Sequence, residues 1–227
     1  RAALFNVLHD AVKAAGVEVE PLSQIKSLDG TSLIVKEARR EGPFDLVIDA
    51  LGSRSPLIPH ASGPDYRSAL AYGAIWSSLP WPGAPFDPNA LEQRYDKASI
   101  MLGVLPIGRQ HEEAVEQTAF FWSLKTDEFG MWREAGLEHW KSRVLGYWPE
   151  CQPLMDAVST PDQMVLASYH HHTLSIPYGE RLVFIGDSAH ATSPQLGQGA
   201  NMALLDVSAL AFALKEHADL RDALRAY

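Results

Sequence analysis

The chain has 227 residues, of which 46% are hydrophobic and 21% are charged, and its formal net charge is -9. This length can bury a sizeable core in one large domain or two smaller ones. The acidic balance argues against nucleic acid as a partner, and no apolar run reaches the roughly 18 residues of a transmembrane helix. We therefore expect a cytoplasmic globular protein without a membrane segment, and both ends of the sequence look cut from something longer.

The only cysteine, Cys151, cannot form an internal disulfide. We expect a structural thiol rather than a catalytic one, and no oxidising compartment is implied. The sequence also contains no Ser-His-Asp order, zinc-ligand spacing or P-loop.

The first 55 residues have an α/β pattern. Apolar residues at helical spacing predict a helix that opens the chain and ends at Gly16. Strands are expected at residues 17–20, 33–37 and 44–49, and the last is apolar enough to be buried on both faces. The turn at residues 50–53 is a candidate site edge, because ligands of open α/β sheets lie beyond the carboxyl ends of strands.

Residues 56 to about 175 have a different character, with several prolines and all six tryptophans. They predict a separate antiparallel layer with strands at 71–77, 99–105 and 118–124, a helix at 134–145 and a long loop around prolines 80–88. The tryptophans, Phe120 and Phe121 fill a core more often than they line an aromatic substrate pocket, although both remain open.

The strongest signal begins at Arg181 and has the order strand, glycine turn, helix. Residues 182–185 predict a buried strand, Gly186 lets the backbone turn where a ligand approaches, and Asp187 presents a carboxylate suited to a sugar-like hydroxyl. After a second glycine pair, Gly197 and Gly199, a long apolar helix is expected from about Ala200. Its free N–H groups would stabilise negative charge on a bound group.

The motif begins with Gly-Asp-x-Ala-His at residues 186–190, and Pro194 follows after a gap of three residues. After a further gap of two residues comes Gly-x-Gly-x-Asn at residues 197–201, and Asp206 lies five positions later. The pattern resembles the second flavin motif of the para-hydroxybenzoate hydroxylase-like monooxygenases, the aromatic-ring hydroxylases. The resemblance implies that Asp187 binds the ribityl chain of FAD and that Pro194 lies near the reactive edge of the flavin ring. Residues 197–201 would meet its pyrimidine end. The implied cofactor-binding set is Arg1, Gly186, Asp187, Pro194, Gly197, Gly199, Ala200 and Asn201.

Two weaker matches accompany this motif. Arg1 and Leu4 resemble the family's Arg-x-x-Leu, whose arginine contacts FAD. The turn at residues 50–55 matches the family's Asp-Gly-x-x-Ser-x-x-Arg only at Gly52 and Ser55. Asp49 instead gives an Asp-Ala-x-Gly-x-x-Ser form, similar to that of some halogenase-like and reductase-like relatives.

The family's Gly-x-Gly-x-x-Gly unit, which holds the FAD pyrophosphate, does not occur in the sequence. If these residues are the whole polypeptide, we expect weak or absent FAD binding. Otherwise the resemblance implies an FAD-dependent monooxygenase that uses NAD(P)H and O2 to hydroxylate a small aromatic or apolar substrate. The alternatives are a halogenase-like or reductase-like flavoenzyme and a non-catalytic remnant.

The predicted fold is α/β (α+β): part of an FAD-binding Rossmann-like domain at residues 1–56 and 176–227, and an antiparallel substrate domain at 57–175.

The run His170-His171-His172 is not expected to hold a metal, because neighbouring side chains of a strand alternate faces. His190 receives no catalytic role, because it is at least as well suited to capping its loop. No catalytic residue or oligomeric state is predicted.

Overall fold

The computed structural model describes residues 2–109, 114–194 and 197–227. It divides into two compact units, each described by itself below. Unit 1 comprises the first 19 residues and Ala71–Ser168, and unit 2 comprises Glu20–Leu70 and Tyr169–Tyr227. The division into functional domains at residues 56 and 175 remains a prediction.

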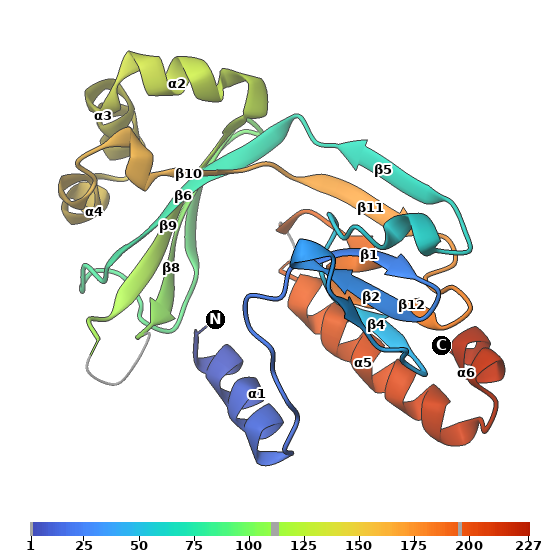
Figure 1. Cartoon of the computed structure of the whole chain (residues 1–227). Helices are drawn as coiled ribbons and strands as arrows, with labels where there is room; N and C mark the ends of the chain where they lie inside the picture. Colours follow the sequence, from blue (N-terminus) through green and yellow to red (C-terminus); the bar gives the residue numbers. More distant parts are fainter. Residues whose placement is uncertain (1, 110–113, 195–196) are drawn as a thin grey trace. The chain divides into compact units, whose positions relative to one another are not determined.

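Unit 1 is built on a five-stranded antiparallel sheet with the order β10-β6-β9-β8-β7. Its strands are β6 (Tyr72–Pro80), β7 (Glu92–Asp96), β8 (Ile100–Gly108), β9 (Gln117–Lys125) and β10 (Val165–Ala167). Its helices are α1 (Ala2–Ala14), α2 (Phe129–Ala135), α3 (Leu137–Tyr147) and α4 (Gln152–Ala157). Helices α2, α3 and α4 lie on one side of the sheet (Figure 1).

The core of unit 1 forms where alternate residues of the strands meet these helices. Ile75 pairs with Trp122, and Trp122 also pairs with Leu102, so the three side chains share the face that packs against the helices. Phe120, Trp140 and Trp148 are buried in the same cluster. The expectation of an aromatic core is confirmed for these residues. Trp122 and Trp140 also border a hollow of about 220 Å³ beside α2 and α3.

Cys151 lies in this core and is fully buried. Burial, assisted by the charge of Glu150, raises the pKa of its thiol to about 12. Because the thiolate is the reactive species, we expect no reaction with a disulfide reagent at pH 8 in the folded protein, and one thiol per chain in denaturant. Rapid labelling of the folded protein would contradict the assignment of a structural thiol.

Unit 2 contains three small sheets with the orders β1-β2-β3, β12-β4 and β13-β11-β5. Its strands are β1 (Ile25–Asp29), β2 (Ser32–Val35), β3 (Arg40–Glu41), β4 (Val47–Asp49), β5 (Asp65–Ala69), β11 (His170–Leu174), β12 (Leu182–Phe184) and β13 (His190–Ala191). Its helices are α5 (Gly199–Glu216) and α6 (Leu220–Ala226). The strands β12 and β4 are parallel, whereas the other ladders are antiparallel.

The main predicted elements are present, with the mixed helix and strand architecture expected. The opening helix is α1, and Gly16 follows it at a φ of 69°, a left-handed conformation that suits glycine after a helix. The three predicted strands of the antiparallel layer correspond to β6, β8 and β9. The helix expected at 134–145 is interrupted at Gly136, whose φ of 80° separates α2 from α3.

Two expectations were wrong. Residues 17–20 form no strand, and Val17 and Val19 are exposed, because the alternating pattern has no neighbouring strand with which to form a ladder. The strand expected at 44–49 is shortened to β4 and is not buried on both faces. Val47 and Asp49 are buried, but the Ile48 side chain between them is 49% exposed.

Candidate functional site

The glycine turn comes one residue after the end of β12, in the order that the sequence predicts. Gly186 to Ser188 form one turn of 3-10 helix, and Gly186 has a φ of 58°, which lies in the left-handed region. A Cβ atom at Gly186 would lie 3.1 Å from the Cβ of Ala203 on α5. Both the backbone conformation and the close approach of α5 therefore require glycine at this position.

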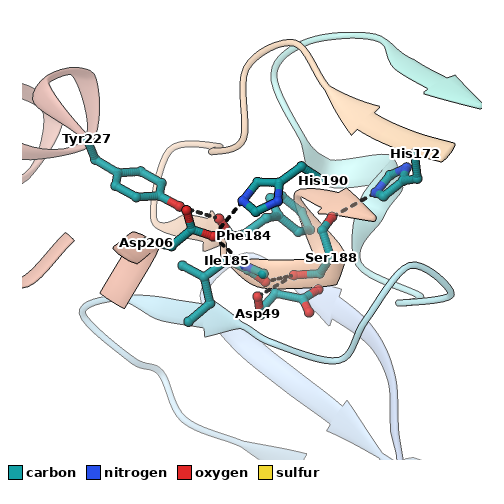
Figure 2. A network of polar contacts seen from close by, with 9 residues as sticks. Asp49, His172, Phe184, Ile185, Ser188, His190, Asp206 and Tyr227 are labelled. Atoms are coloured by element: carbon teal, nitrogen blue, oxygen red, sulfur yellow. Dashed lines mark hydrogen bonds and ion pairs between the residues drawn. The ribbon is translucent and has the colours of Figure 1, made fainter. Parts of the chain in front are cut away.

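Asp206 of α5 fixes the start of this turn. Its Oδ2 accepts a hydrogen bond from the backbone N–H of Gly186 at 2.7 Å and also lies 2.7 Å from Nε2 of His190 (Figure 2). The hydroxyl of Tyr227 donates a hydrogen bond to the carbonyl of Phe184, the last residue of β12, at 3.0 Å. Burial, followed by the Asp206 charge, raises the pKa of Tyr227 to about 12. His190 thus ties the loop to α5, in keeping with its predicted capping role.

Ser188 fixes the other end of the turn through three contacts. Its Oγ lies 2.6 Å from the carbonyl oxygen of Asp49 and 2.8 Å from that of Ile185, and its single hydroxyl proton can satisfy either of them. Its carbonyl oxygen lies 2.9 Å from Nε2 of His172. The sequence assigned no role to Ser188 or His172, because their partners are distant along the chain.

Asp49 organises the neighbouring turn at residues 50–55. The carboxylate is 1% exposed and accepts hydrogen bonds from the backbone N–H of Leu51 at 2.8 Å and from the hydroxyl of Ser55. Ser55 Oγ in turn accepts from the backbone N–H of Leu57 at 3.1 Å, and Gly52 has a φ of 84°. The Asp-Ala-x-Gly-x-x-Ser form is therefore a self-contained turn in which the aspartate satisfies backbone and side-chain donors.

Asp187 differs from its neighbours because its side chain is exposed and makes no hydrogen bond or ion pair within the described residues. A Cβ atom at Gly199, the first residue of α5, would lie 3.8 Å from Oδ1 of Asp187. The carboxylate therefore faces the amino-terminal end of α5 across a position that carries no side chain.

The amino-terminal end of α5 is open within the part of the chain that the structure describes. No side chain caps this helix of 18 residues, and its first turn contains no acidic residue. Gly197 has a φ of 63°, and the amide of Asn201 donates to Gln198 Oε1 at 3.2 Å. Unpaired N–H groups and the helix dipole make such an end favourable for negative charge.

The predicted cofactor residues are distributed around this arrangement. Gly186 and Asp187 form the turn, and Gly199, Ala200 and Asn201 form the first turn of α5. Pro194 is exposed, and its carbonyl accepts from the N–H of Gly197 at 2.9 Å. Arg1 lies outside the described residues. The free carboxylate of Asp187 fits the hydroxyl groups of a ribityl chain. The open end of α5 beside it, which favours negative charge, fits the pyrimidine end of a flavin.

Comparisons with known proteins show what the chain is similar to. A family model described as an FAD binding domain matches residues 155–223. The 6-hydroxynicotinate 3-monooxygenase of Pseudomonas fluorescens is 25% identical over 226 residues, which cover 95% of this chain and 55% of that protein. The chain is thus similar in sequence to a monooxygenase over nearly its whole length.

Solved structures of an oxygenase and of a protein complexed with FAD share the fold. A 2-methyl-3-hydroxypyridine-5-carboxylic acid oxygenase superposes with a TM-score of 0.76 at 19% identity, over 98% of this chain and 59% of that one. A variant of HpxO from Klebsiella pneumoniae, complexed with FAD, gives a TM-score of 0.69 at 19% identity, over 89% and 53%. The chain thus spans somewhat more than half the length of these proteins. In the described residues, no helix has the length and apolarity needed to cross a bilayer.

Proposed function

We propose that the protein carrying this sequence is an FAD-dependent monooxygenase that uses NAD(P)H and O2 to hydroxylate a small aromatic or apolar substrate. The observation that carries the proposal is the uncommitted carboxylate of Asp187 beside the open end of α5. The named activities of the homologues support it. The proposed location is the cytoplasm, where a single unpaired thiol stays reduced.

The chain's own residues would bind and orient the cofactor. Asp187 would accept hydrogen bonds from ribityl hydroxyls, while the first-turn N–H groups of α5 would stabilise negative charge at the pyrimidine end. Pro194 would lie at the reactive edge of the ring. A bound flavin supplies the electron transfer and the activation of oxygen. No protein side chain is needed as a nucleophile, which agrees with the absence of any predicted catalytic residue.

The substrate is proposed to bind on the sheet of unit 1, on the face opposite its buried core. Trp76 pairs with Phe121 across β6 and β9, and Phe121 pairs with Gly103 across β9 and β8. The Phe121 ring lies over Gly103, where an added Cβ atom would be 2.2 Å from the ring. Trp76 and Phe121 are only partly buried, so they offer flat apolar surface for an aromatic ring.

The altered turn at residues 50–55 first suggested a halogenase-like or reductase-like enzyme. The hydrogen bonds that Asp49 accepts stabilise the turn, and this role explains the presence of an aspartate at that position. The named activities of similar proteins, which are oxygenases, favour hydroxylation.

Activity is best tested with the natural polypeptide that contains this sequence. The homologues suggest a panel of hydroxylated pyridine carboxylates as candidate substrates. We expect substrate-dependent oxidation of NAD(P)H together with a product that carries one oxygen atom from 18O2. Oxidation of NAD(P)H by a true substrate without an oxygenated product would contradict hydroxylation.

Asp187→Ala is expected to weaken FAD binding by about 1 to 3 kcal/mol, or roughly 5- to 150-fold, because a ribityl hydroxyl loses its acceptor. Flavin fluorescence titration of the apoprotein measures this change. Asp187→Asn is the matched control, because it keeps an acceptor oxygen but loses the charge, and we expect it to bind FAD with intermediate affinity. Unchanged affinity in Asp187→Ala would remove the assigned role.

A further inference from the structure

The three consecutive histidines of β11 lie in very different surroundings. His171 is exposed, whereas His172 on the opposite face of the strand is fully buried, in agreement with the predicted alternation. Both ring nitrogens of His172 are within hydrogen-bonding distance of oxygen atoms. Nδ1 lies 2.6 Å from Oδ1 of Asp65, and Nε2 lies 2.9 Å from the carbonyl oxygen of Ser188.

The chemistry of these two partners fixes the protonation of the ring. A backbone carbonyl oxygen can only accept, so Nε2 must carry a hydrogen atom. Asp65 also receives a hydrogen bond from Nε of Arg67 at 2.6 Å on its other oxygen. Burial opposes ionisation of Asp65, but the hydrogen bonds from Arg67 and His172 outweigh it and lower the pKa of this carboxyl. A carboxylate that accepts from Arg67 on one oxygen also accepts on the other, so Nδ1 of His172 faces it as a donor.

A buried cation is tolerated when it is paired and fully hydrogen-bonded. His172 meets both conditions, because the Asp65 carboxylate balances its charge and each of its N–H groups has an acceptor. Its neighbour on the same face, His170, contrasts with it. Burial, with the nearby charges of Arg67 and Arg54, lowers the pKa of His170 and favours its neutral form.

The position of this cation gives it a function. His172 holds the carbonyl of Ser188, and Asp206 holds the N–H of Gly186 (Figure 2). The residues on both sides of Asp187 are therefore fixed, while its own side chain is exposed. We propose that His172 is a positioning residue: with both ring nitrogens donating, it fixes the Ser188 carbonyl and thereby aims Asp187 at the ribityl chain. The second half of this inference rests on the proposed binding of FAD.

The protonation state can be tested without any cofactor. In protein labelled with 15N-histidine at pH 7.5, both ring nitrogens of His172 are expected to show imidazolium shifts and directly bonded protons, with His172→Gln providing the assignment. A spectrum with one unprotonated ring nitrogen in His172 would overturn the proposal, whatever the protein does with FAD.

The positioning role is tested by FAD titration of matched variants, made in the natural polypeptide and measured far below its unfolding temperature. We expect His172→Gln to weaken FAD binding by about tenfold, since a charge-assisted hydrogen bond to the turn is lost. His171→Gln, on the exposed face of the same strand, should bind FAD as the unchanged protein does. Equal affinities for both variants would overturn the positioning role.

Asp65→Asn provides a second test of the positioning role and leaves His172 itself unchanged. It keeps the shape of the partner but removes its charge, so His172 is expected to lose one ring proton in the NMR spectrum and FAD affinity is expected to fall in parallel. Loss of the proton without loss of affinity would separate the charge from the positioning role and count against the proposal. Failure of the unchanged protein to bind FAD would instead contradict the proposed function.

Discussion

Gly186→Ala is expected to reduce the stability of unit 2 by about 2 to 5 kcal/mol and to abolish tight FAD binding. Two terms contribute to this loss. A non-glycine residue in the left-handed region, which Gly186 occupies at a φ of 58°, costs about 1 to 2 kcal/mol. The new Cβ atom, 3.1 Å from the Cβ of Ala203, adds an overpacking cost of about 1 to 3 kcal/mol. Urea unfolding followed by circular dichroism measures the sum.

Two further variants separate these terms. Gly197 has a similar φ of 63° but nothing within 4 Å of an added Cβ atom, so Gly197→Ala should show the backbone term alone. Adding Ala203→Gly to Gly186→Ala should remove the overpacking cost. The double variant should therefore recover that part of the stability, after allowance for the cost of Ala203→Gly itself. If Gly186→Ala costs no more than Gly197→Ala, the close approach of α5 to the turn is not a constraint on this position.

The parts of the site that could be predicted from the sequence are local ones. The strand β12, the turn at Gly186 and the start of α5 follow one another within a short stretch, and each has its own signal: an apolar run, a glycine and a helical apolar pattern. A motif of this kind fixes the turn without knowledge of the rest of the chain. The exposure of Asp187 follows from the same local geometry.

The contacts that hold the turn could not be predicted, because they join residues far apart in sequence. His172 and Asp65 are separated by 107 positions, and Ser188 and the Asp49 carbonyl by 139. A histidine in a run of three gives no indication of which ring will be buried until the partner strand β5 is known. The failed strand at residues 17–20 has the same cause, since alternation signals a strand only where a neighbour completes the ladder.

Trp140→Ala is expected to lower the stability of unit 1 by about 3 to 5 kcal/mol, the usual cost of deleting a buried aromatic side chain. The Trp140 ring is 2% exposed and makes edge-on contacts with Phe120 at 6.1 Å and with Trp132 at 5.7 Å between ring centroids. All six tryptophans lie between residues 71 and 168, so selectively excited tryptophan fluorescence reports the unfolding of this unit.

Trp140→Phe is the matched control for this prediction. Within the described residues the indole N–H of Trp140 has no hydrogen-bond partner, so its removal sacrifices no hydrogen bond. Phenylalanine preserves an aromatic ring and loses only part of the volume, for which we expect a cost of about 1 to 2 kcal/mol. If both variants lost the same stability, the indole N–H rather than the packed volume would be the stabilising element, and a partner for that N–H would have to exist in solution.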